Sequence, residues 1–187
     1  FPDGGPSFFV RELYLPFNAD RLTDPNRPLS PDEFDQLMSA ARSWLAEKAA
    51  MAYLARAEHC RRQLEIKLLK KGFSREEITP SLDYLEGKGY LNDERFCEAW
   101  LRNRLLHTAE GAVKLLAGLQ NRGIYGRTAE EAVKKALAET DEETLCARAA
   151  EKLQRRGKTG KKLEISLYRL GFSRKVIEKY LKSGENS

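Results

Sequence analysis

The sequence predicts an all-helical protein built as a tandem array of three three-helix repeats, and three observations support this fold class. After residue 31 the chain is dominated by Leu, Ala, Glu, Lys and Arg, the residue types that favour helices. Val, Thr and aromatic residues do not cluster at alternating positions, which argues against a large β-sheet. The third observation is a pattern of leucine and glycine that recurs about every fifty residues.

Three glycines, Gly72, Gly123 and Gly171, anchor this repeat. Leucines lie four, eight and eighteen residues before each glycine: Leu54, Leu64, Leu68, Leu105, Leu115, Leu119, Leu153, Leu163 and Leu167. Leucines four residues apart share one face of a helix, and a glycine after the last turn accepts the left-handed conformation that caps a helix C-terminus. We therefore predict one long and two shorter helices per repeat, about nine helices in three repeats.

The elements are predicted in chain order as follows. Residues 1–29 hold five of the seven prolines and are predicted to form an extended or partly ordered arm, in which Phe8–Val10 and Leu13–Leu15 either pair as strands or dock elsewhere. Residues 30–47 are predicted to form a lead-in helix, separate from or continuous with the first repeat, because Ser30 to Glu33 fits a capping box with Pro31 at the first helical position.

The three repeats are placed at residues 48–91, 92–143 and 144–187. Ser74 and Thr128, each followed by Glu three residues later, are predicted to cap the third helices of the first two repeats. Because each repeat is too small for much of a core, neighbours should share buried faces and stack into an elongated, curved molecule.

Charge and cysteine content restrict the class of protein. The net charge is +5, and residues 144–187 hold 12 Lys/Arg against 4 Asp/Glu, a balance that attracts a polyanion or an acidic protein face. Cys60, Cys97 and Cys146 are odd in number and lack zinc spacing, so we expect buried or half-buried thiols in a reducing cytoplasm. No run of about 18 apolar residues is available to span a membrane. These features predict a cytoplasmic protein, and we expect it to act as a monomer.

Patterns for catalysis are not found. His59 and Cys60 are neighbours in sequence and so point in different directions on a helix. No glycine-rich phosphate loop followed by Lys-Ser/Thr is present, and no metal-ligand set stands out. Within Gly89–Phe96, Asn92 or Asp93 is suited to cap the following helix. Tyr90, in the same segment, and Trp100, just after it, are expected to pack in the core. We predict a protein that is not an enzyme and that needs no cofactor or metal.

Several motifs resemble the RecX family of recombination regulators over about residues 48–182. They are Tyr53–Arg56, Arg61–Leu64, Leu68–Phe73, and Gly89–Phe96 continuing through Ala99-Trp100 to Arg102. The start of the middle repeat's second helix departs from the family, since Glu110-Gly111-Ala112 replaces a Gly-Pro-type sequence.

The resemblance implies a curved array of three-helix repeats that lies in the groove of the filament formed by the RecA recombinase on single-stranded DNA. It also implies inhibition of filament growth, ATP hydrolysis, strand exchange and co-protease activity, and so a role in DNA repair, homologous recombination and the SOS response.

Three groups of cations are candidate contacts for the partner or for DNA. The densest is the run from Arg155 to Lys162, where the alternative is a solvated linker. The second lies near the end of the first repeat's second helix, where lysines also complement the helix dipole. The third is late in the middle repeat's first helix, where both arginines are expected to be exposed, with a solvated face as the alternative. The candidate residues are Lys67, Lys70, Lys71, Arg75, Arg102, Arg104, Arg155, Arg156, Lys158, Lys161 and Lys162.

Two other functions stay open on the sequence. One is a helical protein that binds nucleic acid without sequence preference and without recombinase, although a net charge of only +5 predicts weak binding to bare DNA. The other is a helical scaffold for an unrelated protein. ATP hydrolysis by the cognate recombinase on single-stranded DNA distinguishes both from a filament regulator.

Overall fold

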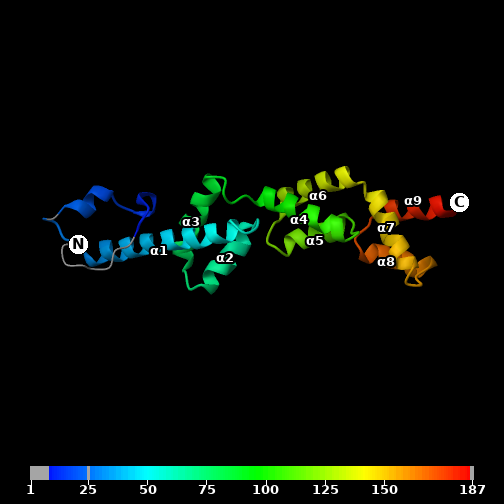
Figure 1. Ribbon diagram of the computed structural model, residues 1–187, viewed down its shortest axis with the longest axis horizontal. Coiled ribbons are helices and arrows are strands. Elements are labelled where there is room, and N and C mark those ends of the chain that lie inside the picture. Colours follow the sequence, from blue (N-terminus) through cyan, green and yellow to red (C-terminus); the bar gives the residue numbers. More distant parts are fainter. Residues whose placement is uncertain (1–8, 25, 186–187) are drawn as a thin grey trace. The chain divides into compact units, whose positions relative to one another are not determined.

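The computed structural model describes residues 9–24 and 26–185, and within these residues the chain is all-helical, with nine α-helices, two short 3-10 helices and no strand (Figure 1). The predicted all-helical fold class is confirmed. The chain divides into two compact units, Phe1–Asn92 and Asp93–Ser187.

The first unit contains α1 (Pro31–Leu54), α2 (Arg61–Lys70) and α3 (Arg75–Gly87). Helix α1 is continuous over 24 residues, so the lead-in helix and the first helix of the first repeat are one element. Ser30 and Ser74 both form the predicted capping boxes, with Glu33 and Glu77. The core of this unit consists of Ala50, Leu64, Leu68, Ile78, Leu82, Leu85 and Leu91.

The N-terminal arm docks on α1. Arg11 and Tyr14 both donate hydrogen bonds to the buried carboxylate of Glu47, from Arg11 Nε at 2.8 Å and from Tyr14 Oη at 2.6 Å. The arm contains two 3-10 helices, η1 (Glu12–Tyr14) and η2 (Ala19–Thr23), so the strand alternative is wrong for Leu13–Leu15. Phe8 lies outside the described residues. Docking, the other alternative, is what the structure shows for Tyr14.

The second unit contains α4 (Asp93–His107), α5 (Ala112–Gln120), α6 (Gly126–Thr140), α7 (Glu142–Gln154), α8 (Gly160–Arg169) and α9 (Arg174–Glu185). Helices α4 and α5 pack on α6, and α8 and α9 pack on α7, which also contacts α6. The two three-helix groups of this unit are thus joined through α6 and α7 (Figure 1).

The predicted glycine caps are confirmed in all three repeats. Gly72, Gly123 and Gly171 have φ of +85°, +89° and +88°. In each case the amide after the glycine donates to the carbonyl of the leucine four residues before it, at 3.2 to 3.3 Å. The leucines at the fourth and eighth positions before each glycine are all buried, whereas of those at the eighteenth position only Leu105 is buried and Leu54 and Leu153 are half-buried.

The predicted cap at Thr128 is wrong, because α6 begins at Gly126 and its N-cap is Tyr125, three residues before Thr128. In all three repeats the third helix starts three residues after the capping glycine, at Arg75, Gly126 and Arg174. This start places Ala129 on the buried face. A capping box contributes about 1 kcal/mol, so the burial of this face decides where the helix begins.

A close backbone contact joins the second and third repeats inside the second unit. The amide of Gly111, before α5, donates to the Leu170 carbonyl at 2.9 Å, and the amide of Val113 donates to the Gly171 carbonyl at 3.2 Å. A Cβ atom added to Gly111 would lie 2.4 Å from the Gly171 carbonyl oxygen. Gly111 therefore places a residue without a side chain where two backbones meet.

The cysteines and aromatic residues complete the packing. Cys60, Cys97 and Cys146 are all buried free thiols, as predicted. Trp100 is half-buried against Gly118, but Tyr90 is more than half exposed, so its predicted place in the core is wrong. Tyr90 follows Gly89, which has φ of +71° and caps the end of α3, and this turn directs the ring outward.

Candidate functional site

The turn between α7 and α8 carries the densest group of cations. Helix α7 ends at Gln154, Gly157 (φ +76°) reverses the chain, and Gly160 (φ +50°) begins α8. The amide of Lys158 donates to the Leu153 carbonyl at 3.1 Å, which closes the end of α7. Two glycines with positive φ therefore hold the cations on a defined turn, which we call the cationic turn (residues 155–162).

All five cations of the cationic turn are exposed: Arg155, Arg156, Lys158, Lys161 and Lys162. Arg155 lies 3.7 Å from Glu151, but both side chains are largely exposed, so this ion pair contributes little. Lys158 Nζ donates to the buried Ser166 hydroxyl at 3.0 Å, which orients this lysine along α8.

The position of two lysines at the start of α8 is electrostatically unfavourable without an anion. Lys161 and Lys162 lie in the first turn of α8, where no acidic residue is present. The N-terminus of a helix already bears a partial positive charge, so cations there repel it. A bound phosphate would relieve both the helix N-terminus and the lysines.

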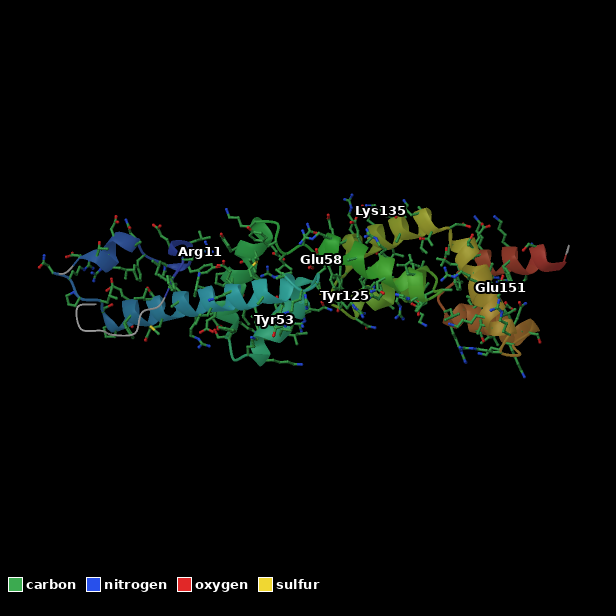
Figure 2. All side chains as sticks on the ribbon, in the orientation of Figure 1. Arg11, Tyr53, Glu58, Tyr125, Lys135 and Glu151 are labelled. Atoms are coloured by element: carbon green, nitrogen blue, oxygen red, sulfur yellow. The ribbon has the colours of Figure 1, made fainter. Side chains whose placement is uncertain are left out.

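A second group of cations surrounds the corner between α2 and α3. Lys67 and Lys71 place their ammonium groups 4.5 Å and 5.6 Å from the ring centroid of Tyr53. Tyr53 lies on α1 and is labelled in Figure 2. Lys70 and Arg75 are exposed beside them. Among the described residues, the ion pairs include none of these four cations. The aromatic face holds Lys67 and Lys71 in place while leaving their charge available.

The two arginines of the third group, Arg102 and Arg104 of α4, have different surroundings. The expectation that both arginines of α4 are exposed is wrong for Arg104, which is half-buried and donates to the buried Glu110 carboxylate at 2.6 and 2.9 Å. Lys114 binds the same carboxylate at 2.9 Å. Burial raises the pKa of Glu110, but the hydrogen bonds from Arg104 and Lys114 outweigh it and lower the pKa overall. Arg104 is thus engaged in holding the start of α5.

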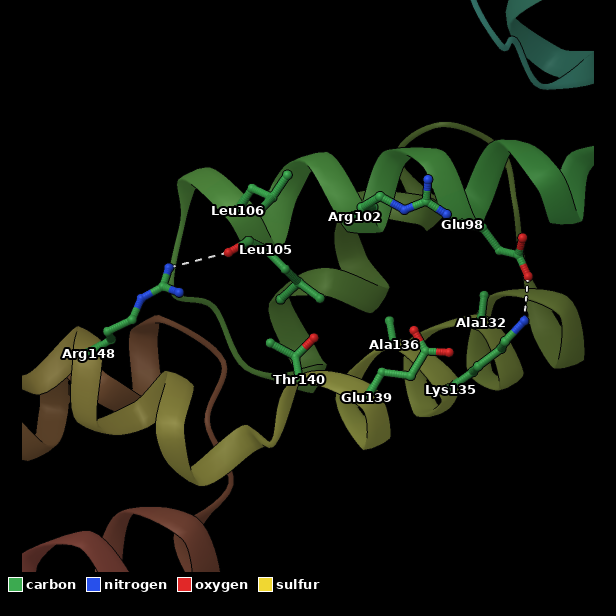
Figure 3. Close-up of a pocket in the computed structure, with 10 residues that line it drawn as sticks. All are labelled: Glu98, Arg102, Leu105, Leu106, Ala132, Lys135, Ala136, Glu139, Thr140 and Arg148. Carbon is green, nitrogen blue, oxygen red and sulfur yellow. Dashed lines mark hydrogen bonds and ion pairs between the residues drawn. The ribbon is translucent and has the colours of Figure 1, made fainter.

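Arg102, by contrast, is exposed at a cleft of about 290 Å³ between α4, α6 and α7 (Figure 3). Leu105, Leu106, Ala132 and Ala136 form its apolar lining. Lys135 of α6 donates to Glu98 of α4 at 2.6 Å, and Arg148 of α7 donates to the Leu105 carbonyl at 3.3 Å (Figure 3).

One ion pair, between Lys135 and Glu98, neutralises part of the charge around this cleft. Two carboxylates, Glu98 and Glu139, face three cations, and the hydrogen bond with Lys135 lowers the pKa of Glu98. The cleft therefore offers a polyanion less than the cationic turn does.

Sequence reasoning missed Tyr53 as the support for Lys67 and Lys71. The residues are 14 or more positions apart in the chain, so no local pattern links them, although Tyr53 belongs to one of the family motifs. It also missed Glu110 as the partner of Arg104. An isolated acidic residue in a loop gives no signal of burial.

The described residues contain no group of His, Cys, Asp and Glu able to hold a metal ion. None of the helices among them is long and apolar enough to cross a membrane. His59 binds the Ala57 carbonyl through Nδ1 at 2.9 Å and its ring lies 5.9 Å from that of Tyr53.

The fold and these surfaces define a class: a helical-repeat protein with exposed cations at the turns beside the second helices of its first and third repeats. Residues 46–85 match the family model for the first three-helix domain of RecX. The chain is 37% identical over 150 residues to the regulatory protein RecX of Treponema pallidum strain Nichols, covering 80% of this chain and 92% of that protein. It is 34% identical to the regulatory protein RecX of Pelodictyon phaeoclathratiforme, covering 71% and 84%. The chain belongs to the RecX family of regulatory proteins.

Solved structures agree on the fold. A crystal structure of regulatory protein RecX superposes with a TM-score of 0.71 at 20% identity, covering 83% of this chain and 79% of that one. A crystal structure of RecX from Lactobacillus salivarius gives a TM-score of 0.66 at 21% identity, covering 78% and 98%.

Proposed function

We propose that the protein is a negative regulator of the RecA recombinase that binds the RecA–single-stranded DNA filament in its groove. Binding restrains filament growth and, with it, ATP hydrolysis, strand exchange and co-protease activity. Membership of a family of regulatory proteins supports a regulatory role. The observation that carries the proposal is the cationic turn, whose five cations are all exposed.

The cationic turn suits phosphates rather than bases. Lys and Arg contact a phosphate backbone and release its counterions without reading the base sequence. A DNA strand held inside a protein filament presents such a backbone at regular intervals. The protein acts by occupying this surface and not by catalysis.

Recombinase ATP hydrolysis on single-stranded DNA tests the proposal directly. The expected result is inhibition at well below one regulator per recombinase subunit, because one bound regulator blocks growth of many subunits. Unchanged hydrolysis at excess regulator contradicts the proposal.

The role of the cationic turn is tested by the variant Arg155→Glu/Arg156→Glu/Lys162→Glu. A single-strand phosphate contact contributes a salt slope of about 0.7, so three lost contacts weaken binding to the filament about a hundredfold at 0.1 M salt and reduce the slope by about 2. The matched control is Arg127→Glu/Lys134→Glu/Lys182→Glu, which changes the net charge equally at exposed positions outside the turn.

Equal losses in the two variants would mean that net charge alone governs binding and that the turn has no special role. A wild-type protein that binds bare single-stranded DNA as tightly as the filament would instead identify a non-specific nucleic-acid binder. Binding to neither would leave a helical scaffold.

A further inference from the structure

The repeats carry a second shared pattern, on the exposed side of their second helices. It emerges when positions are counted from the capping glycine: ten, six, three and two residues before it, and three after it. In the first repeat these positions are Arg62, Ile66, Leu69, Lys70 and Arg75. In the third repeat they are Lys161, Ile165, Tyr168, Arg169 and Arg174. We call these sets the α2 face and the α8 face.

Both faces have the same chemistry, two large apolar residues among three cations. In the second repeat the same positions hold Val113, Ala117, Gln120, Asn121 and Gly126, which include no cation. The pattern is therefore not required by the three-helix fold, because the middle repeat forms the same fold without it.

The apolar residues of both faces are exposed rather than used in packing. Ile66, Leu69, Ile165 and Tyr168 are 37% to 44% exposed. Each pair is spaced three residues apart and so lies on one side of its helix. The opposite side is formed by the buried leucines of the repeat pattern, such as Leu64 and Leu163.

The helix that follows adds an arginine to each face. Leu69 and Arg75 line the same shallow pocket between α2 and α3, together with Ile78. In the third repeat, Arg174 of α9 donates a hydrogen bond to Glu178 at 2.6 Å. Arg174 lies three residues after the capping glycine of the third repeat, the position that Arg75 holds in the first repeat.

We propose that the α2 and α8 faces are two equivalent docking sites for protein, each accepting an apolar patch bordered by carboxylates. Their shared pattern indicates that both bind the same surface, presented by two copies of one partner subunit. This inference rests on the proposed function, in which the partner is a polymer of identical recombinase subunits.

The composition favours protein over nucleic acid. Three of the four apolar residues are aliphatic, whereas surfaces that bind single strands without sequence preference use aromatic rings on which bases stack. Exposed aliphatic side chains surrounded by cations complement an apolar patch with acidic borders. Two such sites on one chain raise the total affinity through effective concentration.

The first experiment compares Ile66→Asp, Ile165→Asp and the double variant with Ala117→Asp, at the equivalent position of the middle repeat, which is also solvent-accessible. Binding is measured to immobilised recombinase–single-stranded DNA filaments and, separately, to bare single-stranded DNA. Losing one anchor of an interface commonly lowers affinity about tenfold, so each single variant should lose about tenfold and the double variant about a hundredfold or more. Ala117→Asp should stay within about twofold of the wild type, and so should the affinity of all variants for bare DNA.

A second pair of variants, Lys70→Glu and Arg169→Glu, avoids the apolar residues and their neighbours in the core, so a folding defect is not expected. Their control is Asn121→Glu, at the equivalent exposed position. Together these two variants should weaken filament binding by about tenfold or more, with helical content and thermal unfolding unchanged.

If the wild-type protein binds the filament and the face variants bind it equally well, this inference is overturned and the proposed function stands. A parallel loss of affinity for bare DNA also overturns it, because the faces would then bind nucleic acid. A wild-type protein that fails to bind the filament overturns the proposed function and this inference together.

Discussion

The contact between Gly111 and Gly171 makes a quantitative prediction for the variant Gly171→Ala. Gly171 has φ of +88°, and an alanine in this left-handed region costs about 1–2 kcal/mol. Its Cβ would lie 2.4 Å from the amide nitrogen of Lys114, so α5 must move away. That movement breaks the hydrogen bonds from Gly111 and Val113 to the α8–α9 turn, at about 1 kcal/mol each. The expected loss is about 3–4 kcal/mol of unfolding free energy.

Gly157→Ala is the matched control in the same unit. Gly157 has φ of +76°, but an added Cβ would meet no atom within 4 Å. Only the backbone cost remains, about 1–2 kcal/mol. The difference between the two variants, about 2 kcal/mol, isolates the contact between the second and third repeats.

Urea unfolding followed by tryptophan fluorescence measures this difference. The chain has two tryptophans, Trp44 and Trp100, so a Trp44→Phe background leaves Trp100 as the reporter of the second unit. Gly111→Ala should give the contact cost without the backbone cost, because Gly111 has φ of −84°. If Gly171→Ala and Gly157→Ala destabilise equally, the repeats yield to the added methyl group without cost, and the reasoning is refuted.

Three further predictions concern buried titratable groups. Burial raises the pKa of Glu47, but hydrogen bonds from Arg11 and Tyr14 outweigh it and lower the pKa below 4.5. Because the pKa is lowered, the contribution of Glu47 to docking of the arm is complete above pH 4.5 and is lost as the pH falls through the folded pKa. The fluorescence of Trp44, which lies against Phe9 of the arm, should report this transition, and the variant Glu47→Gln should not show it. Burial raises the pKa of the Cys146 thiol to about 11, so it should resist alkylation at about pH 8 in the native protein and react on unfolding; rapid native-state labelling would contradict its burial. Glu110→Gln should lower the unfolding free energy by about 1–3 kcal/mol, because Arg104 loses the carboxylate that accepts both of its hydrogen bonds. Urea unfolding measures this loss, and an unchanged midpoint would show that Arg104 finds another partner.

The repeat could be predicted from sequence because its determinants are local. The glycine of each cap and the leucines four and eight residues before it lie within one helix and its turn, and their spacing alone defines a buried face and a left-handed residue. The boxes at Ser30 and Ser74 were predictable for the same reason.

Other features depend on contacts that local spacing does not reveal. Thr128 has a satisfactory capping sequence, yet the register shared by the repeats places the start of α6 at Gly126. Arg104 has the helical position of an exposed residue, but Glu110 returns to meet it across the α4–α5 loop. The arm at Arg11 binds Glu47, which lies 36 residues away. In each case the deciding contact is made by the fold and not by the helical period.

The candidate cations could be identified from the sequence, but which of them form ion pairs with carboxylates could not. Their charge and helix position are read directly from the sequence, whereas ion pairing depends on what the fold brings near them. The same helix, α4, leaves Arg102 exposed and engages Arg104, and only the fold distinguishes the two.

Several charged side chains of the middle repeat pair with one another. Arg104 and Lys114 bind Glu110, Lys135 binds Glu98, and Arg127 binds Glu131. The pairs with Glu110 involve a buried carboxylate and stabilise the start of α5, whereas the Arg127–Glu131 pair is exposed and contributes little.

The outer repeats use few of their corner cations in this way. Lys70 and Arg75 in the first repeat and Lys161 and Lys162 in the third take part in no ion pair among the described residues. Charges already neutralised inside the protein gain little from a polyanion, whereas exposed ones gain counterion release. All three repeats therefore use some charges in internal ion pairs, as Arg61 does with Glu86 and Lys179 with Glu143, and the unpaired corner cations of the outer repeats are the ones that would gain most from binding a charged partner.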